Sequence, residues 1–219
     1  MKYAWIFDMD GVLIDSQQLH YQADRRTLAQ FGVNATQKEV EAFAGTANAE
    51  RFTIYREQFD IAANVEEMVN YRDGVIRQLF LESGIQPIAG VQALLEEICG
   101  LGYPLALASS TDRPMIEWIL ETTGLRSYFR VVVSGEEVSR SKPAPDVFLE
   151  AANKLRMSPS SCFVVEDSVH GIRAAKAAGM WVLGYRNPGS GRQDLSEADL
   201  QTDDFGKISV RTFIRNKEE

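Results

Sequence analysis

Short apolar runs without polar alternation recur along the chain and predict strands that are covered on both faces. The first spans residues 3–7, and four more follow at 104–108, 131–133, 162–165 and 181–185. Strands of a parallel sheet buried on both faces have such continuous apolar runs. Helical patterns separate them; the clearest lies between a candidate N-cap, Ser168, and a candidate C-cap, Gly179. This alternation predicts an α/β protein with a doubly wound parallel sheet.

The pattern changes between about Asp15 and Ser83, where helical stretches occur without any strand-like run. We therefore predict a Rossmann-like core domain, residues 1–14 and 85–219, with a helical cap domain, residues 15–84, inserted after strand 1. Open α/β sheets bind ligands beyond the carboxyl ends of their strands, so this insert should stand over the ligand site. The segment from Asp194 onward has no clear pattern, and residues 217–219 are expected to fray.

Composition narrows the classes of protein to which the chain can belong. It has 219 residues, 45% of them hydrophobic, which suffices for one core plus a small insert. Its net charge of −8, with both signs interspersed, disfavours nucleic acid or an anionic membrane as partner. The first apolar run ends at two aspartates, which excludes a signal peptide or membrane span there. Cys99 and Cys162 have no disulfide or metal-site spacing and are expected to pack in apolar surroundings. We expect a cytoplasmic monomer.

Two carboxylates, Asp8 and Asp10, stand where the first buried strand becomes a loop containing Gly11. Carboxylates near a core are costly unless a cation or hydrogen bonds satisfy them. The alternative is that both cap the following turn through their side chains, as aspartates often do. Taken alone, this pair leaves the two explanations balanced.

Two further strand ends carry residues suited to binding phosphate. Ser109 and Ser110 follow the second run, and their hydroxyl and backbone N–H groups at a helix start could hold phosphate oxygens. The alternative, a plain helix N-cap, suits Thr111 or Asp112 better than Ser109. Lys142 lies in a loop stiffened by Pro143 and Pro145. A lysine facing a crevice can neutralise developing phosphoryl charge, although most lysines are simply solvated.

A second carboxylate pair, Glu166 and Asp167, follows the fourth run. Such oxygen donors suit Mg²⁺, and capping of the helix at Ser168 is compatible with that role. Because the carboxyl ends of parallel strands meet at one edge, these loops should converge on one crevice. The sequence therefore predicts a site for phosphoryl transfer.

These motifs, in this order, resemble those of the haloacid dehalogenase superfamily. The correspondence assigns its four motifs to Asp8-Met9-Asp10-Gly11-Val12, Ser109, Lys142 and Glu166-Asp167. The small cap and the stretch Ser141-Lys142-Pro143-Ala144-Pro145-Asp146 are similar to the β-phosphoglucomutase and sugar phosphatase branch. The match runs over nearly the whole chain.

The resemblance implies a mechanism and a metal. Asp8 would attack phosphorus to form an aspartyl-phosphate, and Asp10 would act as general acid and then general base. Mg²⁺ would be held by the Asp8 and Asp167 carboxylates and the Asp10 backbone carbonyl, with Glu166 acting through water. Ser109, Ser110 and Lys142 would complete the phosphate-binding cradle.

Residues of the cap separate hydrolysis from mutase activity. His20 resembles a histidine that approaches the acid/base aspartate in this branch, the alternative being a helix-face histidine. The mutases grip a second phosphate with an arginine just after a cap-loop glycine, but here Gly45-Thr46-Ala47 is followed by Asn48. Asn48 could hydrogen-bond a substrate hydroxyl or cap a helix. Arg51 lies one turn further on, and Arg72 or Arg77 could also reach the site.

The sequence thus predicts a Mg²⁺-dependent phosphatase that acts on a small phosphorylated metabolite such as a sugar phosphate. The first alternative is a β-phosphoglucomutase-type phosphomutase. The second is a non-catalytic protein that binds a phosphorylated metabolite.

Overall fold

Six parallel strands form a single sheet in the order β3-β2-β1-β4-β5-β6. The structure, a computed structural model, describes residues 2–43, 46–191 and 193–218. The strands are β1 (Ala4–Phe7), β2 (Leu105–Ser109), β3 (Val131–Ser134), β4 (Cys162–Glu166), β5 (Trp181–Tyr185) and β6 (Leu200–Thr202). All five predicted strands are present, and the predicted doubly wound α/β fold is confirmed. The central strand β1 has β2 on one side and β4 on the other. The chain adds strands first on the β2 side and then on the β4 side, and open α/β sheets bind ligands at such a switch point.

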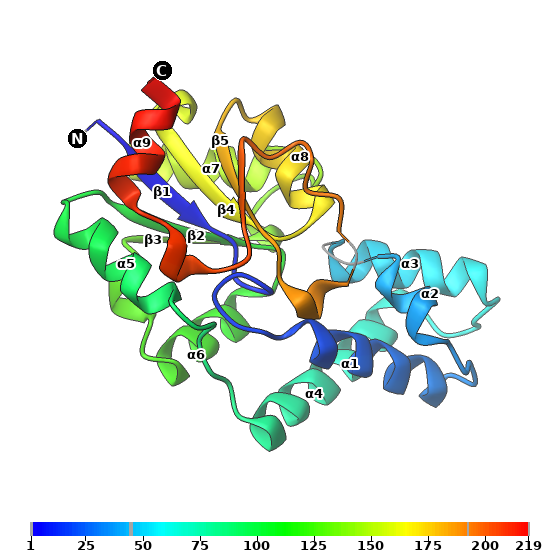
Figure 1. Ribbon diagram of the computed structural model, residues 1–219. Coiled ribbons are helices and arrows are strands. Elements are labelled where there is room, and N and C mark those ends of the chain that lie inside the picture. Colours follow the sequence, from blue (N-terminus) through cyan, green and yellow to red (C-terminus); the bar gives the residue numbers. More distant parts are fainter. Residues whose placement is uncertain (1, 44–45, 192, 219) are drawn as a thin grey trace.

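Helices cover both faces of the sheet (Figure 1). Alternate residues of β1 point to opposite faces: Trp5 and Phe7 join one hydrophobic cluster, whereas Ala4 and Ile6 join another. The first face is covered by α5 (Val91–Gly100), α6 (Arg113–Thr122) and α9 (Val210–Glu218), and the second by α7 (Asp146–Leu155) and α8 (Val169–Ala177). Short 3₁₀ turns occur at η1 (Arg126–Tyr128), η2 (Gly135–Glu137), η3 (Pro159–Ser161), η4 (Pro188–Ser190) and η5 (Phe205–Lys207).

Four helices stand beyond one end of the sheet (Figure 1). They are α1 (Gln17–Gln30), α2 (Gln37–Glu41), α3 (Asn48–Gln58) and α4 (Val65–Ser83). A third hydrophobic cluster, which includes Tyr21, Leu28, Phe52 and Tyr55, joins them. The later part of α4 instead packs on the first cluster of the sheet through Phe80 and its neighbours. This helical layer covers the end of the sheet from which β1 leaves.

The C-terminal segment is more ordered than its sequence pattern indicates. β6 pairs with β5, but three residues of mixed polarity are too few to show a period. Lys217 and Glu218 were expected to fray; instead they lie in α9, and Glu218 forms an ion pair with Lys2. Glu219 lies outside the described residues. Cys162 is buried as expected, whereas Cys99 is exposed.

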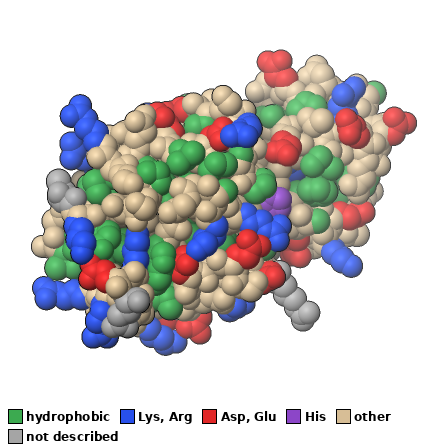
Figure 2. Space-filling view, turned by 90° about the horizontal axis from the view of Figure 1, so that it is seen from above, with side chains coloured by type: hydrophobic (Ala, Val, Ile, Leu, Met, Phe, Trp, Pro, Cys, Tyr) green, Lys and Arg blue, Asp and Glu red, His purple; other side chains and the backbone are tan. Residues whose placement is uncertain are grey.

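The surface is mixed in charge, and Figure 2 shows basic and acidic side chains interspersed over the face it presents. None of the helices described here has both the length and the apolar composition required to cross a lipid bilayer.

Candidate active site

A pocket opens between the carboxyl ends of the central strands and the four helices above them. It encloses about 610 Å³, open solvent included. The core contributes Asp8, Asp10, Ser109, Ser110, Thr111, Lys142, Glu166, Asp167 and Ser168. The helical layer contributes Gln17, His20, Tyr21, Asp24, Val40, Phe43, Thr46, Asn48, Arg51 and Arg72. The predicted catalytic, phosphate-binding and metal-binding residues, together with His20, Asn48, Arg51 and Arg72, are therefore among the residues that line this one pocket.

Lys142 lies between two carboxylates at the floor of the pocket. Phe7 pairs with Val165, so Asp8 and Glu166 follow from adjacent strands. The Lys142 Nζ lies 2.7 Å from Asp8 Oδ1 and 2.7 Å from Glu166 Oε1. Burial alone would lower the pKa of Lys142, but the two carboxylates outweigh burial and raise it. The lysine is thus a buried fixed cation and not a solvated surface residue.

Three buried carboxylates, those of Asp8, Glu166 and Asp167, have oxygen atoms within 4.8 Å of one another. Burial first, and then the neighbouring carboxylates, raise the pKa of Asp8 to about 7 even beside Lys142. The same causes raise the pKa of Asp167 well above its usual range. The single positive charge of Lys142 cannot neutralise three carboxylates, and a divalent cation bound by their oxygens would supply the missing positive charge. The donor set therefore fits a hard metal ion such as Mg²⁺.

Two glycines allow these acids to sit close to the backbone. Gly11 has a φ of +82°, and a Cβ there would lie 2.0 Å from Asp167 Oδ2. A Cβ on Gly171 would lie 1.7 Å from Glu166 Oε1. Ser190 donates a hydrogen bond to Asp167 Oδ2. This serine comes from the loop after β5, and nothing in the sequence pattern singled it out.

The side chain of Asp10 makes its own set of contacts. Its Oδ1 accepts hydrogen bonds from Ser16 Oγ at 2.6 Å and His20 Nε2 at 2.7 Å, and its Oδ2 accepts one from Thr111 Oγ1 at 2.8 Å. Burial alone would raise the pKa of Asp10, but His20 and the hydroxyl hydrogen bonds hold it well below its usual range. Its backbone carbonyl accepts from Gln17 Nε2 at 3.3 Å. Asp10 thus connects the core to the helical layer.

Ser109 is the last residue of β2, and Ser110 follows it in the loop that leads to α6. Ser109 is buried, and its Oγ accepts a hydrogen bond from the Thr111 N–H at 3.1 Å. Asp112 is the N-cap of α6 and accepts from the Met115 N–H at 2.9 Å. Because Asp112 caps the helix, the two serines do not serve as its N-cap.

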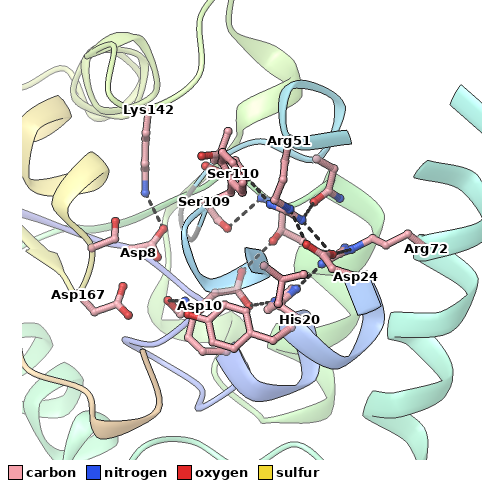
Figure 3. Close-up of a pocket in the computed structure, with 18 of the residues that line it drawn as sticks. Asp8, Asp10, His20, Asp24, Arg51, Arg72, Ser109, Ser110, Lys142 and Asp167 are labelled. Carbon is pink, nitrogen blue, oxygen red and sulfur yellow. Dashed lines mark hydrogen bonds and ion pairs between the residues drawn. The ribbon is translucent and has the colours of Figure 1, made fainter. Parts of the chain in front are cut away.

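Arg51 and Arg72 converge on one buried carboxylate, that of Asp24 (Figure 3). Arg51 Nε lies 2.7 Å from Asp24 Oδ2, and Arg72 Nε lies 3.2 Å from Asp24 Oδ1. Burial alone would raise the pKa of Asp24, but both guanidinium groups hold it below its usual range. Arg51 also donates to Asn48 Oδ1 at 2.7 Å and to the Thr46 carbonyl at 2.6 Å. Both arginines are therefore committed to partners within the protein.

Arg72 also reaches His20. Its Nη2 lies 2.5 Å from His20 Nδ1, and since a guanidinium can only donate, Nδ1 must accept. The imidazole proton is then on Nε2, which donates to Asp10. A chain of contacts thus runs from Asp24 through Arg72 and His20 to Asp10.

The remaining cap predictions had mixed outcomes. Asn48 is the first residue of α3, after the N-cap Ala47, and it contacts Arg51 instead of capping the helix. Arg77 is exposed and is not among the lining residues. Gly45 lies outside the described residues.

Sequence reasoning missed Gln17, Tyr21 and Asp24. They recur at spacings of four and three residues, so they share one face of α1 with His20. The polar residues on this face of α1 were a signal in the sequence, because the helix follows Asp10 closely in the chain. Helical spacing alone, however, does not show which face of a helix lines a site.

Comparisons with known proteins agree with this geometry. A family model described as haloacid dehalogenase-like hydrolase matches residues 5–185. The Bifunctional riboflavin kinase/FMN phosphatase of Arabidopsis thaliana is 34% identical over 81% of this chain. Fructose-1-phosphate phosphatase YqaB of Escherichia coli is 32% identical over 84% of this chain and 97% of its own length. The crystal structure of CbbY from Rhodobacter sphaeroides in complex with phosphate superposes with a TM-score of 0.86 at 26% identity, covering 95% of this chain and 97% of that one.

Some relatives are much longer than the chain. It spans 47% of the Arabidopsis riboflavin kinase/FMN phosphatase and 20% of another Arabidopsis protein, SUPPRESSOR OF QUENCHING 1, chloroplastic. The similarity to these two proteins thus concerns one part of each.

Proposed function

The chain belongs to the haloacid dehalogenase-like hydrolase family, and from that premise we propose that it is a Mg²⁺-dependent phosphatase of small phosphorylated metabolites such as sugar phosphates. The observation that carries the proposal is the convergence of Asp8, Asp10 and Lys142 on one pocket. The similarity to YqaB, a fructose-1-phosphate phosphatase, supports a phosphorylated sugar as the substrate class, and the similarity to the phosphate complex of CbbY supports a phosphate-binding pocket. A protein that only binds a phosphorylated metabolite would not need this buried cluster of a lysine and several carboxylates, which costs free energy to bury.

Asp8 is the proposed nucleophile. One of its carboxylate oxygens bonds to phosphorus while the bond from phosphorus to the leaving oxygen breaks, and Asp10 gives that oxygen a proton. A water oxygen then bonds to phosphorus, the Asp8–phosphorus bond breaks, and Asp10 takes the proton from the water. Lys142 neutralises charge on Asp8 and on the phosphoryl oxygens, while Ser109 and Ser110 orient those oxygens.

Asp8, Glu166 and Asp167, with the Asp10 backbone carbonyl, would hold the Mg²⁺. The ion supplies positive charge that lets an anionic carboxylate approach an anionic phosphate. The hydrogen bonds to Asp10 fix the position of its carboxylate and keep it ionised in the free protein. Asp10 therefore takes up a proton, from the solvent or from a monoanionic phosphate ester, when the substrate binds, and it gives this proton to the leaving oxygen.

The arrangement of the two cap arginines favours hydrolysis over mutase activity. A phosphomutase must hold the second phosphate of a bisphosphate intermediate. Here Arg51 and Arg72 are both bound to Asp24, which offsets one of their two charges. A free arginine clamp for a second phosphate is therefore missing from the part of the pocket that the structure describes.

The proposal includes the domain division, with residues 15–84 as a cap that opens to admit substrate and closes to exclude water. Polar contacts join the two parts, such as Ser141 Oγ to Glu50 Oε2 at 2.8 Å and Gln18 Nε2 to the Gly189 carbonyl at 3.0 Å. These contacts would break on opening, while the apolar packing of the later part of α4 on the core, through Phe80, would persist. We also propose a monomer in the cytoplasm, where the two free cysteines would stay reduced.

The test is phosphate release from a panel of sugar, polyol and glycolate monophosphates, with Mg²⁺ or with chelator. The parent, Asp8→Asn and the surface control Asp203→Asn are compared. Release that needs Mg²⁺, persists in Asp203→Asn and disappears in Asp8→Asn supports the proposal. Conversion of β-glucose 1-phosphate to glucose 6-phosphate without release would make the protein a mutase, and no turnover in either assay would favour the binding-protein alternative.

A further inference from the structure

One buried hydroxyl in the pocket has no hydrogen-bond partner. Four buried side-chain polar atoms of the described residues lack one: Trp5 Nε1, Tyr21 Oη, Thr27 Oγ1 and Arg113 Nη1. Of these four, only Tyr21 belongs to a residue that lines the pocket. Tyr21 is 3% exposed and its hydroxyl is buried, so solvent does not satisfy the hydroxyl either. A buried polar group without a partner is unfavourable, and a bound ligand could relieve it.

Tyr21 lies on the face of α1 that lines the pocket. It follows His20 on α1 and lies about one turn before Asp24. Burial first, then the charges of Glu41 and Asp167, raise the pKa of the phenol. The hydroxyl therefore keeps its proton and offers a hydrogen-bond donor to the pocket at every physiological pH.

The two arginines and the histidine on this side of the pocket are already engaged. Arg51 and Arg72 bind Asp24, and the His20 Nε2–H donates to Asp10. A charged group on the substrate would have to compete with Asp24 for these arginines. An uncharged oxygen only needs the donor that is free.

We propose that the Tyr21 hydroxyl donates a hydrogen bond to an uncharged oxygen, a hydroxyl or carbonyl, on the non-phosphorylated part of the substrate. Tyr21 then selects polyhydroxylated monophosphates over phosphate esters that lack such an oxygen. The inference rests on the proposed phosphatase function and narrows its substrate class.

The test compares two substitutions that each remove one unpartnered hydroxyl from α1. Tyr21→Phe deletes the hydroxyl in the pocket, and Thr27→Val deletes one outside it. The probes are the sugar monophosphate with the highest kcat/KM in the panel above and phenyl phosphate, whose leaving group has no hydroxyl or carbonyl beyond the ester oxygen. The readout is the ratio of the two kcat/KM values, together with the melting temperature without ligand.

We expect Tyr21→Phe to lower this ratio about 10-fold, mainly through the KM for the sugar phosphate, because that oxygen loses its donor. Thr27→Val should keep the parent ratio. Neither substitution should lower the melting temperature, since neither removes a hydrogen bond from the free protein.

Three results would overturn the inference. An unchanged ratio in Tyr21→Phe removes it while leaving the phosphatase function in place. A melting temperature below that of the parent shows that the hydroxyl already has a partner in the free protein. Absence of phosphate release from every probe by the parent removes the proposed function and this inference together.

Discussion

Replacing Asp24 by asparagine tests whether the buried arginine pair depends on one carboxylate. Asp24 accepts four hydrogen bonds: from Arg51 Nε at 2.7 Å and Nη2 at 3.3 Å, from Arg72 Nε at 3.2 Å and from Tyr55 Oη at 3.3 Å. An asparagine would keep one acceptor oxygen and turn an NH₂ group toward a guanidinium. The two buried cations would then lose the carboxylate that they share.

Removing one member of a buried ion pair costs about 3–5 kcal/mol, because the remaining charge is left without compensation. Since the free energy of unfolding of a typical domain is only about 5–15 kcal/mol, Asp24→Asn should lose a large share of its stability. The assay is urea unfolding at neutral pH, followed by tryptophan fluorescence. The matched control is Asp73→Asn, whose carboxylate lies 3.5 Å from Arg72 Nη1 but is partly exposed. For this weaker and partly solvated pair we expect a loss of about 1 kcal/mol or less.

The pH dependence provides an internal check. The pKa of Asp24 is lowered in the folded protein, so its contribution is present above the unfolded pKa of about 3.9 and is lost as the pH falls through the folded value. The difference between parent and Asp24→Asn should therefore be complete at pH 7 and shrink only below about pH 4. Equal losses in Asp24→Asn and Asp73→Asn at neutral pH would refute the reasoning.

Three further predictions concern the carboxylate cluster. Lys142→Met should lower kcat about 1,000-fold in the phosphate-release assay, because it removes a preorganised cation that lies 2.7 Å from the nucleophile; a change below 10-fold would contradict this role. In chelator, the melting temperature of the parent should fall as the pH rises from about 4 to about 7. The folded state favours the protonated form of Asp8, because the pKa of Asp8 is raised to about 7 from an unfolded value of about 3.9, and this stabilisation is lost as Asp8 ionises. Asp8→Asn should flatten this profile, and an unchanged slope would count against the assignment. Gly11→Ala should raise the Mg²⁺ concentration needed for half-maximal activity, because its Cβ would displace Asp167; Gly179→Ala has a similar φ of +73° and no atom within 4 Å, so it should show only the backbone strain of about 1–2 kcal/mol in unfolding measurements.

Local patterns explain why so much of the core was predictable. Ile6 and Phe7 lie in a strand buried on both faces, and that burial requires an apolar run that can be recognised without any partner. Asp8 and Lys142 stand out because carboxylates and a proline-flanked lysine at strand ends need a physical reason. Parallel strands then bring these ends to one edge, so their convergence follows from the fold class alone.

Other features depend on which surfaces pack together, and local periodicity carries no such information. That Arg51 and Arg72 share Asp24 depends on how α1, α3 and α4 pack, since the residues are 27 and 48 positions from Asp24 in the chain. That Tyr21 remains unpartnered is likewise a property of the assembled pocket. The sequence by itself determined the sheet, the nucleophile and the acids around it, because each depends on burial along one segment. The tertiary structure alone decided which charges the cap leaves available to a substrate, because those charges are set by contacts between segments far apart in the chain.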